Sequence, residues 1–108
     1  MRQLNFIIEG LIVKKDPSCD FSGLIPGTEG YLQAGFSFSP EWDNCIIVAE
    51  FRCGTIECPQ QILKDNSTCV IPAEALQRNT FSIRLIGKHK NYRLTTNKIV
   101  VRQNGGRV

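Results

Sequence analysis

Apolar and polar residues alternate along several short segments of this chain, which is the period of a strand with one buried face. In residues 31–39 the apolar side chains fall at every second position: Leu32, Ala34, Phe36 and Phe38. Residues 44–53 repeat the pattern, and the face expected in the core carries Cys45, Ile47, Ala49 and Phe51. Residues 80–87 do so again, with Phe81, Ile83 and Leu85 directed inward. The chain is therefore predicted to consist mainly of half-buried strands.

The segments between these strands are predicted to be further strands and one long loop. Residues 14–30 contain three glycines and two prolines, so they are expected to form a loop. Pro59 has no N–H to donate to a sheet, so the weaker strand around it is placed at a sheet edge. The additional strands are predicted over residues 4–13 (kinked at Gly10), 55–63, 68–71 and, as one or two strands, 92–103.

One helical turn is predicted after Pro72, because proline suits a first helical position and Glu74 complements the N-terminal dipole. Seven or eight strands at intervals of about ten residues are typical of an antiparallel sandwich. The expected fold class is all-β: an immunoglobulin-like antiparallel β-sandwich with one short helical turn. A single domain is expected for the 108 residues. Its parts would be an N-terminal strand with a long loop (1–30), the sandwich core (31–103) and a loose tail (104–108).

The single Trp of the chain, Trp42, follows the strand-ending Pro40 and lies between two acidic residues. A proline at this place stops the strand from pairing further. Trp42 is therefore predicted to close one end of the sandwich, with its ring against Phe38 or Phe51.

The net charge of +3 is distributed unevenly. Residues 16–74 carry nine acidic residues against Arg52 and Lys64, whereas residues 75–108 carry eight basic residues and no acidic one. In one interpretation the basic strands pair beside acidic ones, and the charges meet across strands. In the other, a basic flank meets an acidic surface of a neighbouring subunit or another partner.

Catalytic chemistry finds little support in the sequence. The single histidine, His89, stands between Lys88 and Lys90, without a group to orient it as a general base. A calcium site could use the acidic residues Asp16, Asp20, Glu41 and Asp43. These residues are better explained as solvated loop residues than as metal ligands. A zinc site would need Cys53 and Cys58 brought to Cys45 and Cys69 by the fold. We therefore expect a protein that is not an enzyme, with no cofactor and no metal; a metal-dependent enzyme subunit is the weakest alternative.

The apolar segments are far too short to span a bilayer. Arg2 is followed by polar residues rather than by a sustained apolar run, so no signal peptide is expected. Folding is therefore expected in the cytoplasm of the host or producing cell, without a membrane partner.

A set of motifs extends over about residues 31–103: an aromatic strand (31–38), a Glu41-Trp42 corner, Ala49-Glu50-Phe51, an Ile71-Pro72 turn with Glu74 and Leu76, Phe81 followed by Gly87, and Thr95-Thr96-Asn97. Together they resemble a β-sandwich domain in virion proteins of tailed phages. It is similar to the N-terminal domain of upper baseplate proteins and to domains attached to head fibres. The resemblance implies a structural protein located in the virion and assembled in the host cytoplasm. It would decorate the capsid or dock on the tail or baseplate, as a homo-oligomer or as part of a larger assembly.

The candidate partner-binding residues are Ile46, Val48, Arg84, Lys98 and Arg102. Ile46 and Val48 give the outer face of strand 44–53 apolar residues that a solvent-facing strand does not need. Either the apolar N-terminal strand covers them within the chain or a second subunit does. The three basic residues would face an acidic surface of the partner. They also support the alternative function, a cytoplasmic nucleic-acid-binding module, although few aromatic residues lie near them for base stacking.

The five cysteines are predicted to be free thiols, because an odd count without a secretion signal argues against a disulfide framework. Intact mass measured without reductant, on protein kept from air, should equal that of the fully reduced chain. A loss of two hydrogen masses would contradict this.

Overall fold

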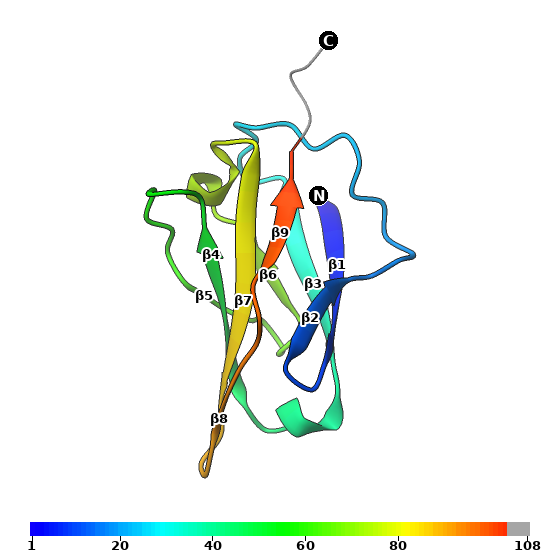
Figure 1. Ribbon diagram of the computed structural model, residues 1–108, viewed down its shortest axis with the longest axis vertical. Coiled ribbons are helices and arrows are strands. Elements are labelled where there is room, and N and C mark those ends of the chain that lie inside the picture. The colour runs from blue at the N-terminus through cyan, green and yellow to red at the C-terminus, as the bar shows by residue number, and fades with distance from the viewer. Residues whose placement is uncertain (104–108) are drawn as a thin grey trace.

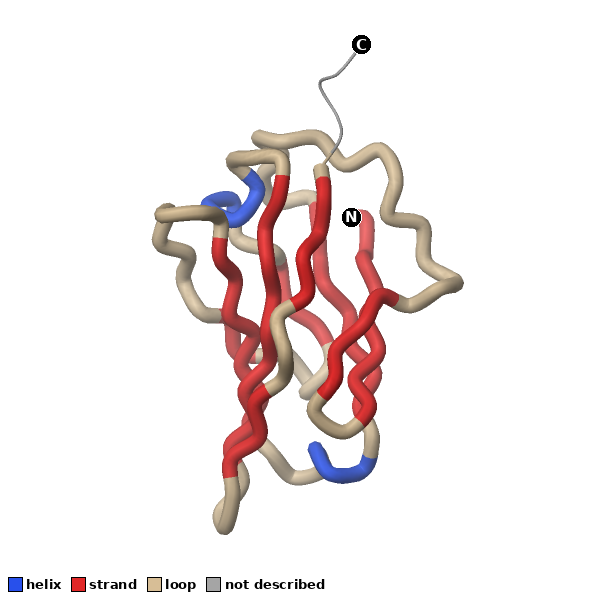
Figure 2. The backbone as a smooth tube through the Cα atoms, in the orientation of Figure 1, coloured by secondary structure: helices blue, strands red, loops and turns tan. Residues whose placement is uncertain are grey.

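Two β-sheets face each other across a layer of apolar side chains in the computed structural model, which describes residues 1–103 (Figure 1). The strands of these residues are β1 (Arg2–Glu9), β2 (Ile12–Lys15), β3 (Leu32–Phe38), β4 (Ile46–Arg52), β5 (Gln61–Ile62), β6 (Thr68–Val70), β7 (Thr80–Lys88), β8 (Arg93–Thr95) and β9 (Ile99–Arg102). Two 3-10 turns, η1 (Pro40–Trp42) and η2 (Ala73–Leu76), lie towards the ends of the sandwich (Figure 2). The predicted all-β sandwich is confirmed.

The order of the strands follows the immunoglobulin pattern. One sheet has the order β2-β1-β3-β6, and the other has β5-β4-β7, with β8 and β9 both paired to the far side of β7. Strands β3 and β6 thus oppose β4, β7 and β9, as strands B and E oppose C, F and G in immunoglobulin domains. One pair departs from the predicted antiparallel arrangement, because β1 runs parallel to β3.

The N-terminal apolar segment is not one kinked strand. It turns back as a hairpin at Gly10, whose φ of 60° is one that a residue with a side chain rarely adopts. Strand β2 then pairs with β1. Both strands belong to the sheet that does not contain β4, which has consequences for the candidate interface below.

The other boundaries differ locally from the prediction. The segment 55–63 forms a strand only at Gln61 and Ile62, where it pairs with β4, and the Leu63 N–H donates one further bond to the Ile47 carbonyl at 2.9 Å. It lies at a sheet edge as expected. The segment 92–103 forms two strands, and η1 is an additional helical turn that the sequence did not indicate. The expected loose tail, 104–108, lies outside the described residues. No helix within residues 1–103 is long and apolar enough to cross a membrane.

The core contains the alternate residues that the pattern assigned to it in β3, β4 and β7, together with residues of β1. Leu4, Phe6 and Ile8 of β1 lie beside the inward residues of β3, and Phe6 stacks on Phe36 with ring centroids 5.5 Å apart. The opposing sheet contributes inward residues that are at most 2% exposed: Ile47, Ala49, Phe51, Phe81, Ile83 and Leu85. Burial of this continuous apolar layer is the main favourable term in folding.

Trp42 closes one end of the sandwich, as predicted. Its side chain is 2% exposed, and its ring lies 5.2 Å from that of Phe38. The indole Nε1–H donates a hydrogen bond of 2.8 Å to the carbonyl oxygen of Gly10. On the opposing sheet the ring faces Gly87, where an added Cβ would lie 2.7 Å from two ring carbons. Trp42 therefore joins β3, the β1–β2 hairpin and β7.

Side-chain hydrogen bonds connect the two sheets along one side. Asn97 lies between β8 and β9. Its side-chain Oδ1 accepts a hydrogen bond from the Val13 N–H at 2.8 Å, and its main-chain N–H donates to the Leu11 carbonyl at 3.2 Å. Next to it, the hydroxyl of the buried Thr96 accepts a hydrogen bond from the Leu85 N–H at 2.9 Å. This bond takes the place of a main-chain bond between strands. The Thr-Thr-Asn motif thus joins the last strands to β2 as well as to β7.

Gly87→Ala should destabilise the fold by about 1–3 kcal/mol, because the new methyl group would overlap the Trp42 ring. Trp42→Ala alone should cost about 3–5 kcal/mol through the cavity that it leaves. In the double variant the methyl group enters that cavity, so the double variant should lose less stability than the sum of the two single variants. Urea denaturation of the four proteins measures the coupling; strictly additive losses would contradict the contact.

Candidate partner-binding face

The outward side of the sheet that contains β4 and β7 carries the predicted partner residues. Because Ile47, Ala49 and Phe51 point into the core, the even-numbered residues of β4 point outward. The register then places Ile46 beside Lys88, Val48 beside Ile86, Glu50 beside Arg84 and Arg52 beside Ser82. This outward side of β4, β5, β7, β8 and β9 is called the basic face below.

Aliphatic side chains gather around Val48 on the basic face. In register, Val48 has Ile62 of β5 on one side and Ile86 of β7 on the other. Ile46 follows two residues earlier on the same strand and is 63% exposed, while Ile62 is 71% exposed. Residues in this relation lie within contact distance across a sheet. The four side chains form a contiguous group, with Ile46 and Ile62 open to solvent.

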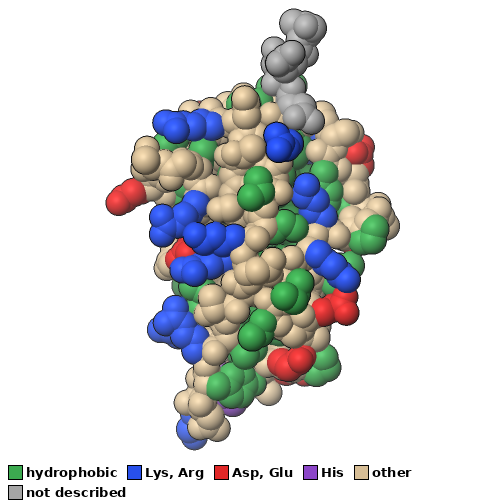
Figure 3. Space-filling view, in the orientation of Figure 1, with side chains coloured by type: hydrophobic (Ala, Val, Ile, Leu, Met, Phe, Trp, Pro, Cys, Tyr) green, Lys and Arg blue, Asp and Glu red, His purple; other side chains and the backbone are tan. Residues whose placement is uncertain are grey.

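Cations lie on the same face as this aliphatic group. Lys88 and Arg93 lie opposite each other in the β7–β8 register, and Val100 and Arg102 of β9 point to the same side as Ser82 and Thr80. The basic residues of this face are Arg52, Arg84, Lys88, Arg93 and Arg102, with Lys98 exposed just before β9. Figure 3 views this side; Lys and Arg side chains gather over it, and acidic ones lie mostly at the right and lower margins.

Glu50 is the acidic residue among the outward positions of these strands. It accepts a hydrogen bond of 2.6 Å from Arg84 Nε and one of 3.0 Å from Gln60 Nε2. The bond from Arg84 lowers the pKa of the Glu50 carboxyl, against the opposing effect of partial burial; Gln60 and Arg52 lower the pKa further. Arg84 is therefore neutralised within the chain, and the other cations of the face are the ones available to a partner.

The structure brings four of the five predicted partner residues to one face by their register: Ile46, Val48, Arg84 and Arg102. The fifth, Lys98, is exposed just before β9. It also excludes one of the two coverings that the sequence left open. The N-terminal strands lie in the other sheet, so no described N-terminal residue covers Ile46 or Val48. The prediction that the N-terminal strand covers Ile46 and Val48 was wrong, because the apolar residues of 4–13 pack into the core or lie in the hairpin that turns at Gly10.

Other members of the face could not be identified from the sequence. Ile62 belongs to a strand of two residues that is too short to show a period, and its outward direction follows from pairing with Val48. Arg93 reaches this side because it lies opposite Lys88. Lysine and arginine at the end of a hairpin are ordinary solvated residues in the sequence alone. Their alignment is a property of the register.

The other candidate chemistries are not assembled by the fold. In residues 1–103, His, Cys, Asp and Glu side chains form no group of three or more that could hold a metal ion. Asp16 and Asp20 each accept hydrogen bonds from the main chain and hydroxyl of a serine two residues on, Ser18 and Ser22, and these bonds lower the pKa of both carboxyls. They organise the loop between β2 and β3. His89 stacks on Tyr92 with ring centroids 4.3 Å apart.

Most of the thiols are at least partly removed from solvent. Cys45, Cys53 and Cys69 are buried, and desolvation raises the pKa of Cys69 to about 12. Burial also raises the pKa of Cys58. A thiol that resists ionisation is a poor nucleophile and a poor metal ligand, so Cys58 and Cys69 are suited to packing rather than to chemistry.

Comparisons with protein-family models, with curated proteins and with solved structures find no match to this chain. Its function is therefore inferred from the arrangement of its own residues.

Glu50→Gln should destabilise the protein by roughly 1 kcal/mol at neutral pH, since it removes the charge that Arg84 faces. Above the ordinary pKa of 4.5 the Glu50 carboxylate is ionised whether the chain is folded or not, so the pair contributes in full. As the pH falls through the lowered pKa of the folded state, the carboxylate is protonated and the contribution disappears. The stability difference between the variant and the wild type should therefore shrink in acid.

Urea denaturation at a series of pH values from about 7 down to about 3 measures this difference. The same substitution in an Arg84→Gln background is the control, and there the pH dependence should be much weaker. A difference that stays constant over the series would show that the ion pair does not contribute.

Proposed function

We propose that this chain is a non-enzymatic structural protein of a phage particle, an immunoglobulin-like sandwich that docks on the capsid or on the tail and baseplate. It assembles in the host cytoplasm as part of a larger particle. The docking surface is the basic face, with Ile46, Val48 and Ile62 at its apolar centre and a protein surface of acidic character as the partner.

The observation that carries the proposal is the coincidence of apolar exposure and unbalanced charge on one face. An aliphatic group open to solvent is an ordinary feature when its members are scattered, but here the members are contiguous. Interfaces commonly place such a group at the centre and polar residues at the rim. The cations of the same face, of which only Arg84 is neutralised by Glu50, favour an acidic partner and speed its association. The motifs from the aromatic strand to Thr95-Thr96-Asn97 supply the virion context.

A cytoplasmic nucleic-acid-binding module is the second candidate, and the row of cations from Lys88 to Arg102 favours it. Phosphate contacts by such residues depend steeply on salt. The aliphatic centre distinguishes the two functions. A protein partner needs Ile46 and Val48, whereas a nucleic-acid backbone needs the cations and tolerates the loss of the isoleucine.

The double variant Ile46→Asp/Val48→Asp tests the docking surface. Its side chains are solvent-exposed or half-exposed, so the fold should persist, whereas desolvated carboxylates at the centre of an interface cost binding energy. The measurement is co-sedimentation of the purified protein with particles of the tailed phage whose genome encodes it. We expect the wild type to sediment with the particles and the double variant to remain unbound.

Val70→Asp is the matched control, because Val70 is 42% exposed on the outward side of the other sheet. It should bind as the wild type does. Circular dichroism of each variant verifies the fold. Undiminished binding of the double variant would rule out this face. Salt-sensitive binding of single-stranded DNA, equal in the wild type and in the uncharged variant Ile46→Ser/Val48→Ser, would support the nucleic-acid module instead.

A further inference from the structure

Strand β9 forms an outer edge of its sheet. Among residues 1–103 it pairs with β7 alone, and in Figure 1 no strand of the same sheet lies on its other side. Strand β2 of the opposite sheet is joined to this edge just before β9 begins, where the Asn97 N–H donates to the Leu11 carbonyl at 3.2 Å. No hydrogen bond between described residues joins β2 to β9 itself. The edge is therefore open from Ile99 onward.

Two residues of β9 direct their main-chain groups to this open side. Gln103, which follows β9, donates its N–H to the Asn79 carbonyl at 2.6 Å and so bonds to the β7 side. Because bonding direction alternates along an antiparallel strand, Val101 does the same, whereas Val100 and Arg102 point the opposite way. Within residues 1–103, the N–H and C=O groups of these two residues have no hydrogen-bond partner.

The edge of β1 is closed by the chain itself. Strand β2 covers only its second half. In the first half, the Asn5 carbonyl accepts from the Asp16 N–H at 3.0 Å, and the Asn5 N–H donates to Cys19 Sγ at 3.3 Å. The loop that follows β2 thus takes the place of a further strand.

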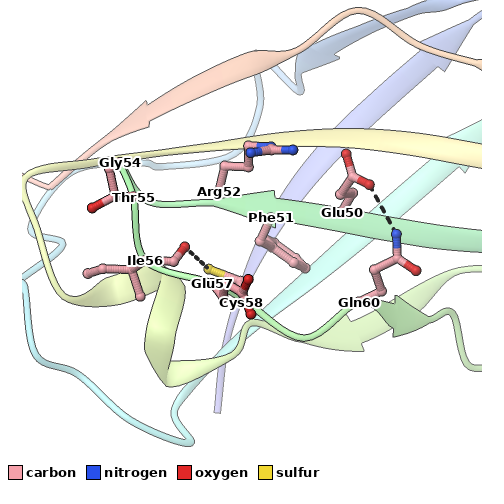
Figure 4. A pocket seen from close by; sticks show the side chains of 9 residues that line it. All are labelled: Glu50, Phe51, Arg52, Gly54, Thr55, Ile56, Glu57, Cys58 and Gln60. Carbon is pink, nitrogen blue, oxygen red and sulfur yellow. Dashed lines mark hydrogen bonds between the residues drawn. The ribbon is translucent and has the colours of Figure 1, made fainter.

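The edge beside β4 is closed as well. Strand β5 pairs with β4 at Ala49, and Cys53 pairs with Ile56. Between these pairs the register places Pro59, which has no N–H, opposite Phe51. The chain bulges there around a pocket of about 350 Å³, which Figure 4 shows between β4 and the connecting loop. Both ends of this interval are held by the chain's own residues, so no added strand fits there, in contrast to β9.

We propose that β9 binds an extended acidic segment of a partner protein, which adds to the sheet as an antiparallel strand. Val100 and Arg102 each offer an N–H and a C=O on the open side, and the residues opposite them would exchange both bonds. Strand addition at an open sheet edge is a general mode of peptide recognition, in which main-chain bonds give affinity and side-chain positions give specificity. The edge is separate from Ile46 and Val48, and it does not depend on the function proposed above.

Charge indicates which partner fits this edge. Arg102 and Lys98 are exposed, and residues 75–108 contain no acidic residue. Like charges opposite each other destabilise a strand pair, and opposite charges stabilise it. Antiparallel pairing of β9 with a second copy would bring the cations of both copies together. An acidic residue opposite Arg102, and another beside Lys98, would instead be favourable.

Burial indicates the residues between these two acids. Val101 is fully buried and Ile99 is half-buried, so peptide side chains opposite them point inward and should be aliphatic. Val100 is 55% exposed, so a neutral polar residue suits the place opposite it. The preferred order is acidic, aliphatic, neutral, aliphatic, acidic.

The test uses the peptide Ac-Ser-Glu-Val-Thr-Val-Glu-Ser-NH₂, titrated to millimolar concentration into ¹⁵N-labelled protein. We expect saturable amide shifts concentrated at residues 99–102, and slower deuterium exchange of the Val100 amide in the complex. Two control peptides each carry one N-methyl group. On the threonine, opposite Val100, it removes a donor to β9 and should weaken binding roughly tenfold. On the first valine, whose N–H points away from β9, it should weaken binding much less.

Absence of saturable shifts, shifts concentrated on other strands, or equal weakening by the two methyl groups would overturn the proposal. Val100→Pro gives a second measurement, because it removes an N–H of β9 at an edge position where proline is tolerated. This variant should stay folded and lose the peptide, whereas the matched control Val100→Thr should bind as the wild type does. Undiminished peptide binding by the proline variant, or dimerisation of the wild type that this variant abolishes, would contradict an acidic partner at this edge.

Arg102→Glu tests the charge and the direction of the added strand. In the antiparallel direction the first glutamate of the peptide lies opposite Arg102. The variant should therefore bind the original peptide more weakly than the wild type does, and it should prefer a peptide in which lysine replaces that first glutamate. The wild type should show the reverse preference. The same order of preference in both proteins would overturn the assigned pairing.

Discussion

The burial of Trp42 is the contact on which the arrangement of both sheets depends. Its ring packs on Phe38 of one sheet and against Gly87 of the other, and its indole nitrogen donates to the Gly10 carbonyl in the β1–β2 turn. A buried indole both contributes a large apolar surface and requires a partner for its N–H. The requirement is met only if the hairpin, the corner after β3 and the last residues of β7 meet at one end of the sandwich. The absence of a side chain at residue 87 allows that approach.

This packing determines which residues remain outside. With the inward residues of β4 and β7 committed to the core, their outward residues form one surface, and the hairpin of β1 and β2 is held in the opposite sheet. The aliphatic group around Val48 consequently stays uncovered by described residues. On this surface the charges of Glu50 and Arg84 neutralise each other. The remaining cations and the exposed isoleucines are what a partner meets.

The two sides of the sandwich differ in how the main-chain groups at the strand edges are hydrogen-bonded. On one side Asn97 and Thr96 use their side chains to replace missing main-chain pairs, so the edge is satisfied at these two residues. On the other side Pro59 interrupts the β4–β5 ladder and leaves Phe51 unpaired. The interruption beside β4 therefore arises at one proline and is not shared by the opposite side of the sandwich.

The alternating pattern alone determined most of the strands and the inward residues of β3, β4 and β7, because a period of two is a local property. The prolines at 40 and 72 indicated the role of Trp42 and the helical turn after Pro72, since they too act locally. It could not determine pairing. The parallel β1–β3 pair, the return of the chain at Gly10, and the outward positions of Ile62 and Arg93 depend on contacts between distant segments. The buried polar residues Thr96 and Gln103 were missed for the same reason, since their partners are main-chain groups of other elements. The candidate residues Ile46, Val48, Arg84, Lys98 and Arg102 were chosen from sequence, but only the register of the strands brought Ile46, Val48, Arg84 and Arg102 to one face.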